Sequence, residues 1–166
     1  MELLNFDKLK PGDNTKIAEM SKMATEILRE HYDPILGKEQ NDYMLELFQS
    51  KSAIAGQLES GYIYYFVKRK DENIGFLAYY PRGAALYLSK FYLYLNERRK
   101  GYSHIMLDFL KQQARSLGLK SIELNVNKHN DAILAYERLG FEIIRLEKND
   151  IGHGYYMDDY VYSLSI

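Results

Sequence analysis

A basic turn, Arg98-Arg99-Lys100-Gly101-Tyr102-Ser103, is the segment of this chain whose residue types and order best suit the binding of a phosphate. It lies between an aromatic-rich run, Ala85 to Leu95, and an amphipathic stretch, His104 to Leu117. The first turn of a helix has unpaired backbone N–H groups and a partial positive charge, so an anion binds there without special side chains. The cations add charge, and Gly101 permits a positive φ and the close approach of a ligand. The turn is therefore predicted to hold a pyrophosphate, although a solvated basic turn is the simpler alternative.

The spacing of glycines narrows the kind of phosphate site. Neither G-x-x-x-x-G-K-[ST] nor G-x-G-x-x-G is present at this turn. The turn resembles the Q/R-x-x-G-x-G/A signature of the GCN5-related N-acetyltransferase (GNAT) family, with Arg98 first, Gly101 at the central glycine, and Ser103 where glycine or alanine is usual. The resemblance implies that the pyrophosphate of acetyl-coenzyme A is bound by Arg98, Arg99, Lys100, Gly101, Tyr102 and Ser103.

A second segment, Asn127 to Phe141, resembles the family's Asn...Ala-Ile-x-x-Tyr-x-x-x-Gly-Phe pattern and follows the turn across one expected helix and one strand. Two ordered matches are more specific than either alone. The spacing from Asn130 to Tyr136 is one residue shorter than usual, so either Asn127 or Asn130 fills the position of the coenzyme-binding asparagine. The resemblance is clearest from Ile74 onward. It implies an α/β, GNAT-like fold with a mixed, mostly antiparallel central sheet flanked by helices on both faces.

Length and composition agree with such an enzyme. The 166 residues suit a single domain, 1–166, with a sizeable core. The absence of cysteine excludes a disulfide framework, a thiol nucleophile and a zinc–thiolate site. The formal net charge is only −1, whereas a nucleic-acid-binding protein usually has a strong basic excess. We therefore expect no nucleic-acid partner. Sixteen tyrosines are expected to be mostly half-buried strand residues.

Other features of the sequence bear on membrane association and on metal binding. Met1–Phe6 has no basic segment followed by an apolar core, and no window approaches a membrane span, so a cytoplasmic protein without a membrane partner is expected. His31, His129 and His153 lack metal-ligand spacing, and we expect no metal.

Periodicity and turn residues predict the elements that must position these residues. The first expected helix is capped by Asn14 or Thr15 and ends near Tyr32–Pro34. Its buried positions are Ile17, Met20, Met23, Ala24 and Ile27. A second helix follows, with an apolar stripe of Tyr43, Met44, Leu47 and Phe48. Strands are expected at 62–68, 74–80 and 85–95, a helix at 104–117, a strand at 121–127 and a helix at 131–139. Strands at 141–146 and 155–166 are expected to be joined by a mobile segment, 148–154.

Acetyl transfer from a thioester to an amine needs a polarised carbonyl, a neutral amine and a proton for the departing thiolate. The resemblance implies that backbone groups near Phe91 and Leu93 face the pantetheine and the thioester, and that the Leu93 N–H polarises the carbonyl; ordinary core packing is compatible with this role. Tyr136 matches the family's acid for the coenzyme sulfur, and a phenol with a pKa near 10 can supply that proton. A tyrosine that only packs on the sheet is the alternative.

Several residues are candidates for holding the water that takes the amine proton, and the sequence does not choose among them: Ser89, Tyr92, Glu123 and Asn125. Glu123 and Asn125 are expected on the strand face opposite Ile122 and Leu124. Because the chain has no cysteine or metal cluster, direct transfer between bound substrates is favoured over a covalent acetyl-enzyme.

The acceptor is predicted from the last strand. Met157-Asp158-Asp159-Tyr160, preceded by His153 and Gly154, resembles the C-terminal segment of bacterial polyamine-acetylating relatives, and Tyr32–Gly37 adds to this likeness. Asp158 and Asp159 would attract the second ammonium of a polyamine such as spermidine or spermine, although a turn or pairing with arginines is an equal alternative. A peptide or protein N-terminus is the alternative acceptor, and a non-catalytic acyl-coenzyme A sensor the alternative function. The tyrosine-rich final strands are candidates for pairing in a homodimer.

Overall fold

The computed structural model describes residues 3–166 and contains one seven-stranded sheet with flanking helices. The strand order is β1-β2-β3-β4-β5-β7-β6. The registers of β1–β2, β2–β3, β5–β7 and β6–β7 are antiparallel, and that of β4–β5 is parallel. The predicted class, a mixed and mostly antiparallel sheet flanked by helices, is confirmed. Its last strand in sequence, β7, lies between β5 and β6, so β6 rather than β7 is the edge strand.

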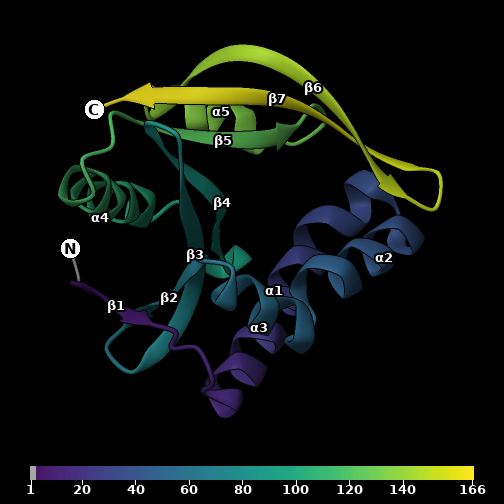
Figure 1. Cartoon of the computed structure of the whole chain (residues 1–166), viewed down its shortest axis with the longest axis horizontal. Helices are drawn as coiled ribbons and strands as arrows, with labels where there is room; N and C mark the ends of the chain where they lie inside the picture. Colours follow the sequence, from purple (N-terminus) through teal and green to yellow (C-terminus); the bar gives the residue numbers. More distant parts are fainter. Residues whose placement is uncertain (1–2) are drawn as a thin grey trace. The chain divides into compact units, whose positions relative to one another are not determined.

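The chain forms two compact units. The first contains the residues up to Tyr80 and Lys90–Tyr102; the second contains Pro81–Ser89 and Ser103–Ile166. The elements that begin in the first unit are β1 (Leu4–Lys8), α1 (Asn14–Leu36), α2 (Lys38–Gln49), α3 (Lys51–Glu59), β2 (Ile63–Arg69), β3 (Glu72–Arg82) and the 3-10 helix η1 (Leu95–Glu97) (Figure 1). The second unit contains the start of β4 (Ala85–Leu93), nearly all of α4 (Tyr102–Ser116), β5 (Ser121–Asn127), α5 (Ala132–Arg138), β6 (Glu142–Gly152) and β7 (Tyr155–Ser165).

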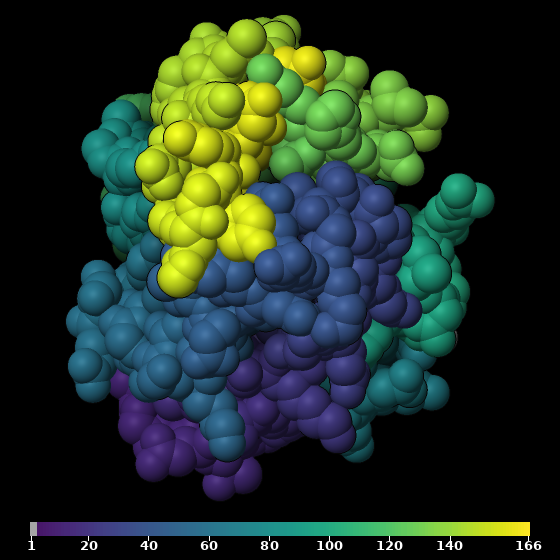
Figure 2. Space-filling view, turned by 90° about the vertical axis from the view of Figure 1, so that its right-hand side faces the viewer, coloured from purple at the N-terminus to yellow at the C-terminus, as the bar shows by residue number. Residues whose placement is uncertain are grey.

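In the first unit, α1, α2 and α3 cover one face of β2 and β3. The five α1 positions predicted to be apolar and buried are all buried, and they pack in one core with Tyr64, Phe66, Phe76 and Ala78 of the strands. The outer sides of α1 and α2 form a continuous surface, which runs from purple to blue in Figure 2. This packing fixes α1 against the strands that lead to the basic turn.

The ends of α1 differ from the prediction. Its N-cap is Asp13, whose side chain accepts a hydrogen bond from the Lys16 N–H at 3.1 Å, and not Asn14 or Thr15. The helix continues through Pro34, because a proline in the last turn removes only one helical hydrogen bond near an end that is already incompletely bonded.

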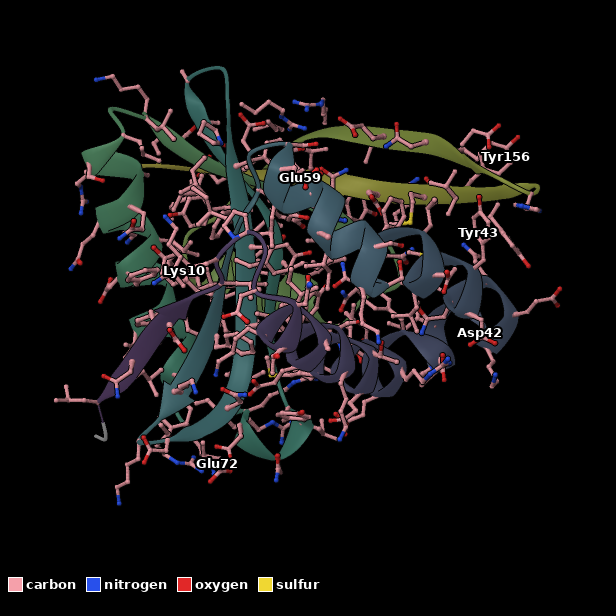
Figure 3. The ribbon with its side chains drawn as sticks, turned by 60° about the horizontal axis from the view of Figure 1, so that its bottom comes forward. Lys10, Asp42, Tyr43, Glu59, Glu72 and Tyr156 are labelled. Atoms are coloured by element: carbon pink, nitrogen blue, oxygen red, sulfur yellow. The ribbon has the colours of Figure 1, made fainter. Side chains whose placement is uncertain are left out.

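The predicted apolar stripe of α2 is wrong. The buried residues of α2 are Asn41, Leu45 and Gln49, whereas Leu47 is exposed and Tyr43, Met44 and Phe48 are half-buried. The Asn41 amide donates to Leu28 O at 3.2 Å and to Asp33 Oδ1 at 2.7 Å, so a polar side chain joins α2 to α1. Figure 3 shows Asp42 on the solvent side of this helix. The strand β1 and the helix α3 were not predicted.

In the second unit, β5 has the predicted bounds and the predicted faces. Ile122, Leu124 and Val126 are buried on one side of the strand. The parallel register with β4 runs from Ala85 opposite Ser121 to Tyr87 opposite Glu123, whereas β5 pairs with β7 along its whole length. The polar residues Glu123 and Asn125 therefore lie on the opposite face, as expected.

The strands β6 and β7 form a hairpin longer than predicted. The segment predicted to be mobile, 148–154, is mostly strand: β6 reaches Gly152, and only His153 and Gly154, both with positive φ, make the turn. Pairing across the hairpin places Lys148 opposite Asp158, and the Lys148 ammonium lies 4.8 Å from the centroid of the Tyr156 ring. Such cross-strand contacts stabilise a strand that its polar composition alone does not predict. Tyr156 is near the tip (Figure 3).

Candidate active site

The basic turn is built by two residues with positive φ. Arg98 is extended, Arg99 has φ 62° and Gly101 has φ 83°, and α4 begins at the next residue, Tyr102. Ser103 is the second residue of that helix. This turn leads directly into a helix N-terminus, where backbone N–H groups lack helical partners. The positive φ at Gly101 agrees with the expectation from sequence.

A buried carboxylate that the sequence analysis missed anchors the turn. Glu97 is 6% exposed and accepts two hydrogen bonds from the Arg69 guanidinium, whose Nη1 is also 3.3 Å from Tyr102 Oη. Lys100 Nζ lies 3.5 Å from Glu97 Oε2. The hydrogen bond from Arg69 is the main reason that the pKa of Glu97 is lowered. An acidic residue just before a basic run was the only signal in the sequence, and its partner is 28 residues away.

The end of β4 is held close to β3 by a glycine. Phe91 is half-buried and Leu93 is buried. A Cβ atom on the buried Gly75 would lie 2.2 Å from Tyr92 O and 3.0 Å from Leu93 Cα. No side chain other than hydrogen fits there, so Gly75 sets the position of the backbone predicted to face the thioester.

In the second unit, both candidate asparagines shape the loop between β5 and α5. Asn127 Oδ1 accepts the His129 N–H at 2.9 Å, and Asn130 Oδ1 accepts the Ala132 N–H at 2.8 Å. They are 5% and 4% exposed. Asn130 therefore bonds to the first turn of α5, and the oxygen atoms of both side chains order the backbone of this loop.

Tyr136 lies on α5 and is half-buried. Its ring makes an edge-to-face contact with Phe141, with the centroids 5.8 Å apart, and its carbonyl accepts the Phe141 N–H at 3.1 Å. The next residue, Glu137, accepts the hydroxyl of Tyr162 on β7 at 3.1 Å. The helix that carries Tyr136 is thus fixed by packing and by a hydrogen bond to the sheet.

A polar network crosses the face of β4, β5, β7 and β6. Asn125 accepts the Tyr87 hydroxyl at 2.9 Å and donates to Glu147 at 3.2 Å and to Asp159 at 3.3 Å. Asp159 is only 2% exposed. Four strands therefore place an amide between two carboxylates, an arrangement that links residues far apart in the sequence.

Further charges border this network. Hydrogen bonds from Asn149 first, and then from Arg145, lower the pKa of Glu147. Glu123, a candidate base, lies 3.6 Å from Arg82 and 4.0 Å from Arg145, so it is part of an ion-pair network. Of the carboxylates on this face, Glu147 is thus kept ionised at neutral pH.

Asp158 and Asp159 are not a joint carboxylate pair. As neighbours on β7 they point to opposite faces of the sheet. Asp158 pairs with Lys128 at 3.0 Å, and its carbonyl accepts the Lys128 N–H. Asp159 instead belongs to the network around Asn125.

Within residues 3–166, no group of three or more histidine, aspartate or glutamate side chains is arranged to hold a metal ion. No helix in the same range has the length and apolar character needed to cross a membrane.

Comparisons with known proteins identify the family. The model of the acetyltransferase (GNAT) family matches residues 24–141. Among solved structures, PaiA N-acetyltransferase from Thermoplasma acidophilum in complex with coenzyme A aligns over 99% of both chains, with a TM-score of 0.79 and 16% identity. A GCN5-related N-acetyltransferase from Rhodopseudomonas palustris covers 100% of this chain and 96% of its own, with a TM-score of 0.79 and 12% identity. The ribosomal-protein-S18-alanine N-acetyltransferase from Escherichia coli covers 99% and 94%, with a TM-score of 0.66 and 17% identity. No curated protein matches the sequence.

Proposed function

This chain belongs to the acetyltransferase (GNAT) family, and on that premise we propose that it transfers an acetyl group from acetyl-coenzyme A to a primary amine of a polyamine such as spermidine or spermine. The observation that carries the proposal is the basic turn, in which Arg99 and Gly101 adopt positive φ immediately before α4 begins. Its geometry fits a pyrophosphate, because backbone N–H groups and two exposed cations, Arg99 and Lys100, lie at one helix N-terminus.

The proposed role of the basic turn in phosphate binding is tested by placing a larger, negatively charged side chain at Gly101. Gly101→Glu is expected to abolish coenzyme A binding in calorimetry, since the carboxylate repels the phosphates and the side chain fills the turn. Gly83→Glu is the matched control: Gly83 also has a positive φ, 61°, and its Cβ would meet no atom within 4 Å. Both variants carry similar backbone strain, so unchanged affinity in Gly101→Glu would rule out the turn as the phosphate site.

When bound, the coenzyme supplies the thioester acetyl group. The Leu93 N–H would polarise its carbonyl, and the Tyr136 hydroxyl would protonate the departing sulfur. The fixed backbone at Leu93 and the fixed orientation of α5 support these roles, because both require groups that are positioned before the reaction.

The polyamine acceptor is supported by the carboxylates of the second unit. Asp159 and Glu147 are joined by Asn125, and the lowered pKa of Glu147 keeps that group ionised at neutral pH. Asp158 is already neutralised by Lys128, so Asp159 is the better candidate of the two predicted aspartates. Ionised carboxylates suit the second ammonium of a polyamine, which a monoamine lacks.

The decisive experiment measures coenzyme A release from acetyl-coenzyme A with a panel of spermidine, spermine, putrescine, amino acids and short peptides. Turnover with polyamines alone is expected. Turnover with peptides alone would replace the acceptor by a peptide N-terminus, an alternative to which the similarity with the alanine N-acetyltransferase from Escherichia coli gives some weight. Tight coenzyme binding without turnover of any amine would favour a sensor.

A further inference from the structure

Arg98, the first residue of the basic turn, faces the protein rather than the turn. Its Nη2 donates to Leu93 O at 3.3 Å, and its Nη1 lies 3.4 Å from His31 Nδ1 on α1. Arg98 is half-buried, whereas Arg99 and Lys100 are exposed. A guanidinium has only donors, so this contact requires the lone pair of His31 at Nδ1. Arg98 thus joins the turn to β4 and to α1.

The helix α1 also contacts Tyr92, the residue before Leu93. The hydroxyls of Tyr32 and Tyr92 are 2.9 Å apart, and the ring of His31 makes an edge contact with Tyr32 at 4.8 Å between centroids. The Tyr92 ring also packs on Phe76, 5.7 Å away. His31 therefore lies against both the tyrosine pair and Arg98.

Contacts with β3 also fix the backbone of residues 92–94, at the end of β4. Tyr92 O approaches Gly75 too closely for any side chain, and the Tyr94 N–H donates to Ile74 O at 3.0 Å. The register of β3 against β2 shifts at this point, since Gly75 is opposite Val67 and Asn73 is opposite the next residue. Together with Arg98, these contacts fix the peptide groups on each side of Leu93.

We propose that Arg98 and His31 are positioning residues for acetyl transfer, which couple the coenzyme-binding turn to the backbone at Leu93. This inference rests on the proposed function. Backbone N–H groups, with Arg99 and Lys100, bind the phosphates, and the Arg98 guanidinium orders the strand that presents the Leu93 N–H to the thioester. The family signature predicted that Arg98 binds the phosphates. The contacts of Arg98 in the structure indicate instead that it orders the end of β4.

Kinetics separate the two roles of Arg98. Arg98→Lys keeps the charge but loses the planar fork that reaches both Leu93 O and His31. We expect kcat to fall about tenfold or more while the Kd of coenzyme A changes less than about threefold, because misplacement of reacting groups affects the chemical step. Arg99→Ala is the comparison, and its Kd is expected to rise. A raised Kd with unchanged kcat in Arg98→Lys would make Arg98 a phosphate ligand and overturn the proposal.

His31 is tested by a pair of substitutions. His31→Phe keeps an aromatic ring but removes the acceptor, and it is expected to lower kcat as Arg98→Lys does. His31→Gln offers an oxygen acceptor to Arg98 and is expected to recover part of the loss. Equal kcat in both variants would show that only packing matters at this position and would overturn the role of His31.

A third readout is independent of turnover. In 15N-leucine-labelled protein, coenzyme A is expected to shift the amide resonance of Leu93, and this shift is expected to shrink in Arg98→Lys although coenzyme still binds. An unreduced shift would refute the coupling even if no acceptor were found. Failure of the wild-type protein to acetylate any amine, with the reduced shift present, would refute the proposed activity alone.

Discussion

Gly75→Ala is the substitution with the most definite structural consequence. The new Cβ would lie 2.2 Å from Tyr92 O and 2.9 Å from Leu93 Cδ2, whereas real Cβ contacts are essentially never closer than 3.0 Å. Moving from 2.2 Å to 3.0 Å requires a displacement of about 0.8 Å between the backbones of β3 and β4. The Leu93 side chain can rotate, but Tyr92 O is a backbone atom. The strand itself must move.

That displacement has two expected effects. Overpacking in a closely packed sheet destabilises a protein by about 1–3 kcal/mol. A shift approaching 1 Å at the group that polarises the thioester carbonyl is expected to lower kcat by about 10- to 100-fold. We expect both losses in the same protein, with coenzyme A affinity less affected, because the phosphates are proposed to bind the backbone N–H groups, Arg99 and Lys100 of the basic turn rather than β4.

The assays are urea unfolding and steady-state kinetics at saturating substrates. Gly56→Ala is the matched control, since Gly56 lies in α3, its Cβ would meet no atom within 4 Å, and alanine in a helix is expected to stabilise the protein by about 0.5–1 kcal/mol. A Gly75→Ala protein with wild-type stability and kcat would refute the close approach of β3 to β4 and the reasoning built on it.

Three further predictions concern single side chains. Glu97→Gln is expected to lower the free energy of unfolding by about 1.5–3 kcal/mol at pH 7, because Arg69 loses the charge-assisted hydrogen bonds of its buried carboxylate partner and keeps the longer ion pair with Glu72, at 3.6 Å. Since the pKa of Glu97 is lowered on folding, this stabilisation is present above the usual glutamate pKa and is lost as the pH falls through the lowered one, so urea titrations are expected to show the two proteins converging in acid. Tyr136→Phe keeps the ring and is expected to lower kcat by about 10²-fold or more; an unchanged pH–rate profile would exclude Tyr136 as the acid. Asp159→Asn is expected to raise KM for spermidine more than for a monoamine, and more than Asp158→Asn does; equal effects on both amines would leave Asp159 a structural residue.

The second half of the chain was the more predictable from sequence. The strand Ser121–Asn127 was predicted with its correct bounds, since strict alternation places its apolar residues on one face. The basic turn was predicted because Gly101 and the neighbouring cations are local signals. The hairpin of β6 and β7 was predicted too short, because contacts between its two strands, such as that of Lys148 with the Tyr156 ring, stabilise its outer half and depend on the fold.

The first half contained weaker signals. The helix α3 is short, but Ser50 caps it by accepting the Ala53 N–H at 3.2 Å, and a serine before a helix-compatible run was a usable indication. A glycine within a predicted strand, Gly75, also indicates a close backbone approach. The pairing of Glu97 with Arg69 gave no such indication, because ion pairs between distant segments depend on the fold.

The hydroxyl groups of several tyrosines form hydrogen bonds that phenylalanine, with a ring of the same size, could not form. Tyr94 donates to Glu26 at 2.7 Å, Tyr32 bonds to Tyr92, and Tyr87 donates to Asn125, so in each unit hydroxyl groups join one element to another. Each such hydrogen bond contributes about 1 kcal/mol. A ring alone would supply the apolar contact but would allow neighbouring elements to slide. Ten of the sixteen tyrosines lie in strands and only six of those are half-buried, so the expectation that most tyrosines are half-buried strand residues is wrong. The hydroxyl groups act instead through directional bonds between elements. Transfer chemistry requires such direction at the end of β4. Tyr92 in this strand and Tyr94 just after it are both hydrogen-bonded to α1, on either side of Leu93, whose N–H is proposed to meet the thioester.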